Sequence, residues 1–342
     1  MSSTPGYCVL TRLGTTNGEI LGWDGQKCDD ERLEFVRSMT RHRFERLLRG
    51  ELEADNLKVF VKQEAHKVSK LKEGRFRLIQ AVSLVDTMLD RVLFGWLGRS
   101  CLASVGKTPC LVGWAPLRGG WRELQARFTG KRVVCIDKSA WDWTVPDWLV
   151  DMWFSFITEL AYNPAEWWID MVGKRFKLLF EEARFQFEDG TVVEQGLRGV
   201  MKSGCYLTIL LNSVSQSMLH YLANWEMGVS PTFRQPFTMG DDTVQETPSD
   251  LLRYAGILER FGFKLKGVKV QNWIEFAGFA YTGKTCFPAY WAKHLYNLGH
   301  TEALKEVLVS YQYLWAHEPE MSAYVRRVAA AVDVRLVLPR RI

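Results

Sequence analysis

The 342-residue sequence lacks the features of a disulfide-bonded, zinc-binding or membrane-spanning protein. Its seven cysteines form no CxxC pair and follow no regular spacing, so neither a zinc site nor a disulfide framework is indicated, and we expect reduced thiols. It contains no run of 18 or more apolar residues, and its N-terminus lacks a basic-then-apolar signal pattern. Internal repeats and low-complexity tracts are also absent. We therefore expect a soluble chain in a cytosol-like compartment.

What is present is ordinary globular composition, with 47% hydrophobic and 24% charged residues. The formal net charge of +5 is mild and does not by itself indicate a nucleic-acid partner. The length predicts two or three subdomains. Helical patterns alternate with strand patterns. The segments that we interpret as helices or strands are 29–55 (helix), 57–80 (strand, loop, strand), 81–98 and 146–160 (helices), 132–143 (an apolar strand ending at an acid), 166–195 (helix and hairpin), a long helix from about 205, 235–247 (hairpin), 249–282 (helix and strand) and 290–335 (helices). This pattern predicts an α+β core with helical attachments.

Two adjacent acids stand out in "FTMGDDTVQE", residues 237–246. The apolar flanks can pair as antiparallel strands, and Gly240 suits the first position of a type II′ turn. Asp241 and Asp242 then lie at the tip of a hairpin. Taken alone, this stretch fits a solvated turn and a metal site equally well.

A second acidic site lies in "VVCIDKSAWD", residues 133–142. The apolar strand Val133–Ile136 delivers Asp137 at its end, and so apolar a strand rarely ends in an acid that has no partner. Asp142 has an alternative interpretation as the cap of a helix that starts near Pro146. If Asp137 lies beside the hairpin, three carboxylates converge. Such a cluster is stable around cations, and two Mg²⁺ ions would satisfy it.

The long helix carries two faces. Leu207, Leu211, Val214, Met218 and Leu222 fall at helical spacing and predict its core stripe. Thr208, Asn212 and Gln216 share a polar face, which is either solvated or directed at a sugar. Ser203 and Gly204 precede the helix in a loop that we expect to be flexible.

A basic segment supplies the fourth feature. Lys62, Lys67, Lys70, Lys72, Arg75 and Arg77 cluster within sixteen residues. Arg75 and Arg77 alternate with apolar residues, so we expect both guanidinium groups on one side of a strand. The segment is either a solvated face or a binding site for a triphosphate.

In their order along the chain, these segments resemble the motifs of RNA-dependent RNA polymerases from positive-strand RNA viruses. The segments are "STPGY" (3–7, motif G), "KQEAHKVSKLKEGRFRLI" (62–79, F), "DKSAWD" (137–142, A), "SGCYLTILLN" (203–212, B), "GDD" (240–242, C), "ERFGFKLKGVKV" (259–270, D) and "IEFAGFAY" (274–281, E). The wording of motifs G, F and B is most similar to that of the sobemovirus-like group.

The resemblance implies a right-hand fold of palm, fingers and thumb, with an antiparallel palm sheet flanked by helices. The implied divisions are fingers at 1–130, palm at 131–158, a fingers insertion at 159–199, palm at 200–283 and a small helical thumb at 284–342. Motif E usually carries a cysteine where this chain has Ala277, and motif G lies almost at the N-terminus. Because the family generally has more fingers sequence before motif G, we expect the chain to be the catalytic portion of a larger product.

The resemblance also implies roles for individual residues. Asp137, Asp241 and Asp242 would hold two Mg²⁺ ions, with Mn²⁺ as a substitute. Either Lys266 or Lys269 would protonate the leaving pyrophosphate. Phosphates of the incoming nucleotide would bind Lys62, Lys70, Arg75 and Arg77, and its ribose would be positioned by Asp142, Ser203, Gly204, Thr208 and Asn212.

The implied activity is template-directed RNA synthesis from NTPs during replication of a viral genome. The implied partners are template and nascent RNA, a genome-linked protein primer and other viral replication proteins, in membrane-associated complexes of the host cytoplasm. The alternatives are a catalytically impaired RNA-binding protein of the same fold, a reverse transcriptase and a two-metal nuclease. Reverse transcriptases typically show a YxDD-like turn, whereas Gly240 precedes the acids here.

Overall fold

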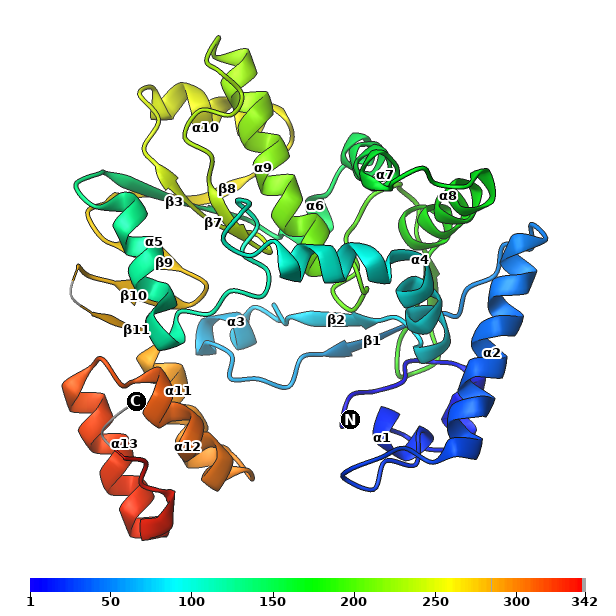
Figure 1. The fold of residues 1–342 in the computed structure, drawn as a ribbon, viewed down its shortest axis with the longest axis horizontal. Helices are drawn as coiled ribbons and strands as arrows, with labels where there is room; N and C mark the ends of the chain where they lie inside the picture. Colours follow the sequence, from blue (N-terminus) through cyan, green and yellow to red (C-terminus); the bar gives the residue numbers. More distant parts are fainter. Residues whose placement is uncertain (284, 340–342) are drawn as a thin grey trace. The chain divides into compact units, whose positions relative to one another are not determined.

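The computed structural model describes residues 1–283 and 285–339. Residues 284 and 340–342 of the expected thumb lie outside this described part. The chain divides into two compact units, and each is discontinuous in sequence. The first comprises residues 1–103 and 140–211, and the second comprises residues 104–139 and 212–342. The elements of both are labelled in Figure 1.

The first unit combines a small sheet with several helices. Its elements are η1 (Val9–Arg12), α1 (Asn17–Ile20), α2 (Asp30–Leu48), β1 (Leu57–Val61), α3 (Val68–Lys72), β2 (Leu78–Ala81), α4 (Leu84–Ala103), α6 (Trp141–Thr144), α7 (Asp147–Leu160), α8 (Glu166–Phe180), β4 (Arg184–Gln186) and β5 (Val192–Glu194). The strand order is β2-β1-β4-β5, and only the β1–β4 pair is parallel.

The predicted hairpin is confirmed as β4–β5, although Asp189-Gly190, a dipeptide typical of two-residue turns, does not form one here. The Phe187 N–H donates to the Thr191 carbonyl, which leaves a three-residue loop at 188–190. Gly190 has φ +87°, in the left-handed region that such loops require at their last position.

A buried ion pair joins α4 to α8 inside the first unit. The Arg175 guanidinium donates from Nε to Asp90 Oδ1 at 2.6 Å and from a terminal nitrogen to Oδ2 at 3.2 Å. Both side chains are essentially inaccessible to water. Because removal of one partner would leave a buried unpaired charge, the loss would cost about 3–5 kcal/mol.

The second unit contains two antiparallel sheets. Its elements are η2 (Leu117–Gly119), α5 (Gly120–Phe128), β3 (Val133–Lys138), β6 (Phe237–Met239), β7 (Asp242–Glu246), α10 (Leu251–Arg260), β8 (Leu265–Gln271), β9 (Ile274–Phe276), β10 (Phe279–Tyr281), β11 (Cys286–Pro288), α11 (Trp291–His300), α12 (Leu304–Leu314), α13 (Pro319–Val332) and η3 (Val334–Leu336). The strand orders are β6-β7-β3-β8 and β11-β10-β9. Helix α5 packs on these strands through Trp121, Leu124 and Phe128.

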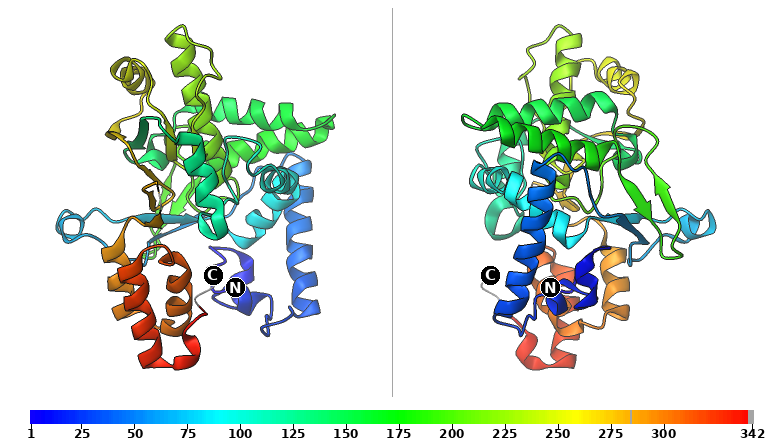
Figure 2. Two further views of the ribbon diagram at one scale, coloured as in Figure 1. Left: turned by 60° about the vertical axis from the view of Figure 1, so that its left-hand side comes forward. Right: turned by 90° about the vertical axis from the view of Figure 1, so that its right-hand side faces the viewer.

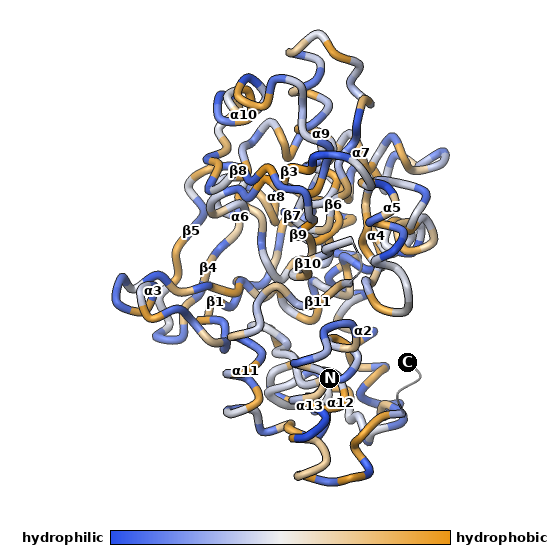
Figure 3. The backbone as a smooth tube through the Cα atoms, turned by 90° about the vertical axis from the view of Figure 1, so that its left-hand side faces the viewer, coloured by the Kyte–Doolittle hydropathy of each residue, from blue (hydrophilic) through white to orange (hydrophobic). Residues whose placement is uncertain are grey.

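The helices predicted for 290–335 are α11, α12 and α13, which lie together in Figure 2. They bury Leu308, Trp315 and Val325 in a cluster of their own. Hydrophobic and hydrophilic residues alternate along them in Figure 3, as expected of helices that are buried on one face only.

Helix α9 (Thr208–Glu226) continues from the first unit into the second, whose part begins at Asn212. The predicted core stripe is right for Leu207 and Leu211. It is wrong for Val214, Met218 and Leu222, which are only half-buried.

The buried face of α9 instead carries polar residues at four-residue spacing: Asn212, Gln216, His220 and Asn224. Gln216, His220 and Asn224 have internal hydrogen-bond partners, as when Asn224 Nδ2 donates to the Phe233 carbonyl at 3.0 Å. The solvated alternative for this polar face is therefore wrong from Asn212 onward, because hydrogen bonds compensate the burial.

All seven cysteines lie in the described ranges, and none of them forms a disulfide there. Among the helices of the described residues, none is both long enough and apolar enough to span a bilayer.

Candidate active site

Asp241 and Asp242 lie on the β6–β7 hairpin. Met239 pairs with Asp242, so Gly240 and Asp241 form a two-residue turn. Gly240 has φ +65° and Asp241 does not have positive φ, which is the type II′ combination expected from the sequence. The Gly240 N–H donates to Ser213 Oγ of α9 at 2.8 Å. Helix α9 thereby fixes the position of the turn.

Strand β3 brings Asp137 beside this hairpin. β3 pairs antiparallel with β7, with Cys135 opposite Val244. The same register, continued by two residues, sets Asp137 opposite Asp242. Thr243 Oγ1 donates to the Ile136 carbonyl at 3.3 Å and reinforces this register.

On its other side β3 pairs with β8, and a β-bulge occurs next to Asp137. Asp137 pairs with Gly267 and Lys138 with Leu265, so Lys266 is the extra residue between them. Bulges redirect side chains. Here Lys266 Nζ donates to Asp137 Oδ2 at 2.8 Å. Lys269 instead lies in the regular ladder opposite Cys135, so the structure distinguishes the two lysines that the sequence could not.

The acids influence one another electrostatically. Partial desolvation, and then the charges of Asp241, Asp137 and Glu275, raise the pKa of Asp242 to about 6. Beneath them Lys138 is buried, and its Nζ donates to Gln216 Oε1 at 2.6 Å. Burial lowers the pKa of Lys138 to about 8, against the opposing effect of Asp241 and Asp137.

The donor chemistry of this site fits a hard divalent cation. Carboxylate oxygens are the ligands that Mg²⁺ prefers, and a cation would relieve the repulsion that raises the pKa of Asp242. The present side-chain positions do not form a ready ligand cage, because no three His, Cys, Asp or Glu residues of the described chain are grouped as a metal centre. Asp137 would have to exchange the Lys266 ammonium for the cation.

In the first unit, the loop at Ser203 and Gly204 is fastened to Gln80 by three hydrogen bonds. Ser203 Oγ accepts from the Gln80 N–H, the Ser203 N–H donates to Gln80 Oε1, and the Gly204 N–H donates to the Gln80 carbonyl, each at 3.1 Å. Thr208 Oγ1 donates to the carbonyls of Lys202 and Cys205. The predicted flexible loop is thus held to strand β2, through backbone as well as side chains.

Asp142 lies in α6 and does not cap the next helix. The N-cap of α7 is Pro146, so the capping interpretation of Asp142 is wrong. The Asp142 carbonyl accepts from the Met201 N–H at 2.7 Å. This bond ties α6 to the segment that precedes Ser203.

The basic segment differs from its predicted form. Strand β2 begins only at Leu78, so the expectation that Arg75 and Arg77 alternate along a strand is wrong. Arg75 pairs with Glu73 at 2.5 Å, and Arg77 pairs with Glu64 at 3.0 Å. Lys62 lies 3.5 Å from the same Glu64, while Lys70 lies in the short helix α3. The three cationic side chains of these pairs are 39–64% exposed, although Glu64 is 12% exposed, so the cations remain exchangeable toward an anionic ligand.

Sequence reasoning missed several residues that support these groups: Gln80, Lys138, Ser213 and Glu275. For Lys138 a signal existed, because strand alternation next to an outward Asp137 predicts an inward side chain. For the others no local signal exists, since their partners lie far away in sequence.

The chain has the right-hand fold that is known from polymerases. It superposes on a solved structure described as "Sicinivirus 3Dpol RNA dependent RNA polymerase" with a TM-score of 0.69 at 17% identity, over 99% of this chain and 74% of that one. This likeness shows the shared fold.

Sequence comparison then gives the family. The sequence model described as "Viral RNA-dependent RNA polymerase" matches residues 13–277, and the chain belongs to this family. It is 32% identical over 255 residues to the replicase polyprotein P2AB of Southern bean mosaic virus, which covers 71% of this chain and 25% of the polyprotein.

Similar matches are found in two other viruses. For the P2AB polyprotein of Cocksfoot mottle virus the identity is 30% over 268 residues, 74% of this chain and 27% of the polyprotein. For protein P1-P2 of Turnip yellows virus it is 32% over 256 residues, 68% of this chain and 22% of that protein. The chain thus spans about a quarter of the length of these relatives, and the expected sobemovirus-like resemblance is confirmed.

Proposed function

We propose that this chain is the catalytic portion of an RNA-directed RNA polymerase that replicates a viral RNA genome. The proposal is carried by one observation: strand register sets Asp137 opposite the Gly240–Asp242 hairpin, and a bulge delivers Lys266 to Asp137. In the proposed reaction a primer 3′-hydroxyl attacks the α-phosphate of an NTP, and pyrophosphate leaves. Membership of the polymerase family supports this assignment.

Polymerases of this family generally use divalent metal ions, and we assign two Mg²⁺ ions, replaceable by Mn²⁺, to Asp137, Asp241 and Asp242. When bound, such ions activate the attacking hydroxyl and stabilise the negative charge of the leaving pyrophosphate. Lys138, which is buried next to Asp137 in β3 and bonded to Gln216, is assigned as a counter-charge to Asp137 and Asp241 before the ions bind.

Lys266 is the proposed general acid. Its ammonium group already contacts Asp137, and displacement from this carboxylate would free it to donate a proton to the leaving pyrophosphate. Lys269, the other candidate from the sequence, lies opposite Cys135 in the regular ladder and is given no catalytic role.

Nucleotide binding is assigned to two sets of residues. The phosphates are assigned to Lys62, Lys70, Arg75 and Arg77. Three of these cations pair with Glu64 or Glu73, but each cationic side chain remains at least 39% exposed and can exchange its glutamate for a phosphate. Recognition of the ribose is assigned to Asp142, Ser203, Gly204, Thr208 and Asn212. The hydroxyl groups of Ser203 and Thr208 form hydrogen bonds with backbone groups in this structure, so we assign these two residues mainly to positioning of the loop.

The wider assignments follow from the family and from the relatives. RNA template, nascent RNA and NTPs are the proposed ligands. A genome-linked protein primer and other viral replication proteins are the proposed partners, since the relatives are described as replicase polyproteins. Membrane-associated complexes of the host cytoplasm are the proposed location. Residues 1–130 and 159–199 are proposed as fingers, 131–158 and 200–283 as palm, and 284–342 as thumb.

A non-catalytic RNA-binding protein of the same fold is the second candidate. It would be expected to have lost an acid or the basic segment, yet Asp137, Asp241 and Asp242 are all present, as is the segment 62–77. A reverse transcriptase is disfavoured because Gly240 directly precedes the acids, and a nuclease would have no use for a triphosphate clamp.

The test is extension of an annealed RNA primer on a defined RNA template with Mg²⁺ and all four NTPs. The expected product is full-length, and omission of one NTP is expected to stop synthesis at the first template position that needs it. Products whose sequence does not depend on the template, or no product while the RNA is bound, would refute the polymerase in favour of the binding protein.

A further inference from the structure

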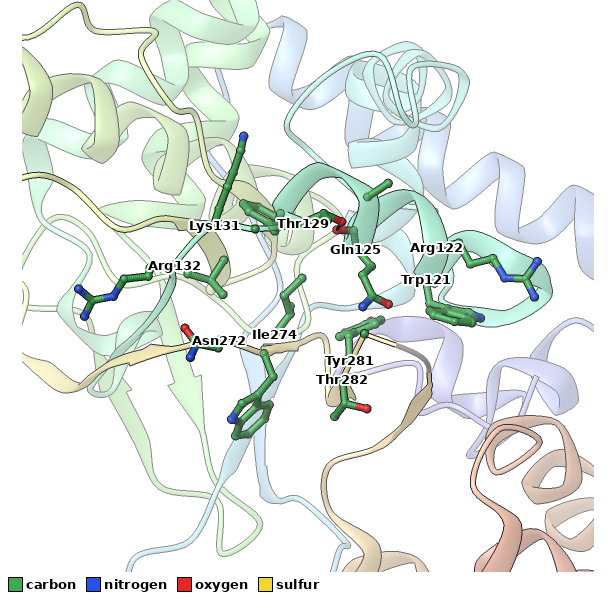
Figure 4. Close-up of a pocket in the computed structure, with 16 residues that line it drawn as sticks. Trp121, Arg122, Gln125, Thr129, Lys131, Arg132, Asn272, Ile274, Tyr281 and Thr282 are labelled. Carbon is green, nitrogen blue, oxygen red and sulfur yellow. Dashed lines mark hydrogen bonds between the residues drawn. The ribbon is translucent and has the colours of Figure 1, made fainter.

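A cavity of about 870 Å³ opens in the second unit, at the end of the sheet opposite the acids. Its walls come from α5, the α5–β3 loop, the β8–β9 turn and β10, and Figure 4 shows their side chains gathered around it. Val133 at the start of β3 lines the cavity, whereas Asp137 lies four residues further along the strand. At about 3.3 Å per residue, the cavity and the acids are separated by roughly 13 Å of one strand.

The charged side chains that line this cavity are all basic. Arg122, Lys131 and Arg132 line it, and no Asp or Glu does. Lys131 pairs with Glu246, but Glu246 is shared with Arg234. Arg132 is solvent-exposed and forms no ion pair with any residue in the ranges 1–283 and 285–339. The cavity therefore attracts an anion.

Its surface is also aromatic. Arg122 lies over the Trp121 ring, with its guanidinium carbon 5.4 Å from the ring centroid. Trp273 is 39% exposed at the β8–β9 turn, although a large aromatic side chain is normally covered. An exposed indole beside unpaired guanidinium groups offers a stacking face to a planar, negatively charged ligand.

Two buried polar atoms of the cavity wall are unsatisfied. Trp121 Nε1 and Gln125 Oε1 have no hydrogen-bond partner within the described chain. A buried donor or acceptor without a partner costs about 1–3 kcal/mol, so such atoms call for a ligand or water. One is a donor and the other an acceptor, so a ligand that reached both would need a mixed hydrogen-bonding edge, as a nucleobase has.

We propose that this cavity binds a segment of single-stranded RNA, one or two nucleotides long, outside the catalytic centre. Trp273 stacks on a base, and Arg132 and Arg122 bind the flanking phosphates. The volume suits this occupant, because ligand sites of 300–1,000 Å³ accommodate molecules of nucleotide size. An acidic peptide would satisfy the arginines but not account for the exposed indole. The inference rests on the proposed function in so far as RNA is the substrate.

The experiment is photo-cross-linking of the full chain to a short oligoribonucleotide that contains 4-thiouridine, without NTPs, followed by mapping of the adducts. Adducts are expected in peptides covering 121–132 and 272–282, in addition to any elsewhere. Trp273→Ala and Arg132→Gln are each expected to reduce the yield in these peptides about tenfold, since base stacking is worth roughly 1–3 kcal/mol. Both residues are exposed, so both variants are expected to fold.

Trp225→Ala and Arg253→Gln are matched controls, because both residues are exposed in the same unit and lie outside the cavity. They are expected to leave the adducts in 121–132 and 272–282 unchanged. The absence of such adducts, or yields equal in all four variants, would overturn the proposal. Prevention of the adducts by a hexaglutamate peptide at equimolar concentration would overturn it too, in favour of an acidic protein partner. Because no NTP is present, failure of the chain to extend primers leaves this readout intact and bears on the proposed function alone.

Discussion

Substitution of Gly204 by alanine is expected to displace the loop that carries Ser203. A Cβ atom at this position would lie 2.6 Å from the Gln80 carbonyl oxygen and 2.9 Å from Ala81 Cα, and both neighbours are backbone. Ordinary contact begins at 3.4 Å, so the loop must move away by several tenths of an ångström. Such a movement breaks or lengthens the three bonds between this loop and Gln80.

The magnitude follows from these bonds. At about 1 kcal/mol each, their loss lowers the free energy of unfolding by about 2–3 kcal/mol. The effect on synthesis is larger, because a misplaced positioning residue can cost about 10²-fold in rate. We therefore expect Gly204→Ala to lower kcat/KM for nucleotide addition roughly 10–100-fold, with RNA binding nearly unchanged.

Gly256→Ala is the matched control, since an added Cβ there has no atom within 4 Å and lies in the middle of α10. It is expected to retain full activity and to gain up to about 1 kcal/mol, because alanine is the better helix former. Urea midpoints and single-nucleotide incorporation rates measure both variants. If Gly204→Ala is as stable and as active as Gly256→Ala, the close packing against Gln80 has no functional importance.

Three further predictions concern proton transfer to the leaving group, recognition of the ribose and the pH dependence of stability. Lys266→Met is expected to slow nucleotide incorporation about 10²-fold while Lys269→Met stays near the native rate; equal rates would remove Lys266 from proton transfer. Asn212→Ala is expected to lower the preference for ribo- over deoxyribonucleotides, measured by competition, and an unchanged preference would leave this side chain a purely structural role. Burial lowers the pKa of His220 below its usual 6.5, so the unfolded state binds more protons just below that pH and stability falls on acidification through this window. Urea titrations at several pH values measure the free energy of unfolding. His220→Gln is expected to reduce its fall on acidification, whereas the control His300→Gln, at an exposed position, is not. Parallel pH profiles for the native chain and His220→Gln would exclude His220 as the cause.

The hairpin and its neighbouring strand could be predicted from the sequence because their signals are local. Gly240 determines the turn type, and the apolar run before Asp137 identifies a buried strand. Helix α9 was harder, because hydrophobic spacing alone cannot reveal that His220 and Asn224 are buried with internal partners. Those partners, such as Tyr254, come from segments that only the tertiary fold brings close.

The same limit applies to the choice between Lys266 and Lys269. Both fit the sequence pattern equally well, and a single-residue bulge in the β3–β8 ladder separates their positions relative to Asp137. A bulge depends on the register of two strands that are more than 100 residues apart in sequence. The resemblance to viral polymerases identified the segment but not the lysine.

The most direct test of the account compares RNA primer extension by the native chain and by Asp241→Asn, at saturating RNA and Mg²⁺. The account predicts templated product from the native chain and none from the variant, although both bind RNA equally and unfold at similar urea concentrations. Extension by Asp241→Asn at a rate near that of the native chain would contradict the assignment of Asp137, Asp241 and Asp242 as the metal-binding centre of the polymerase.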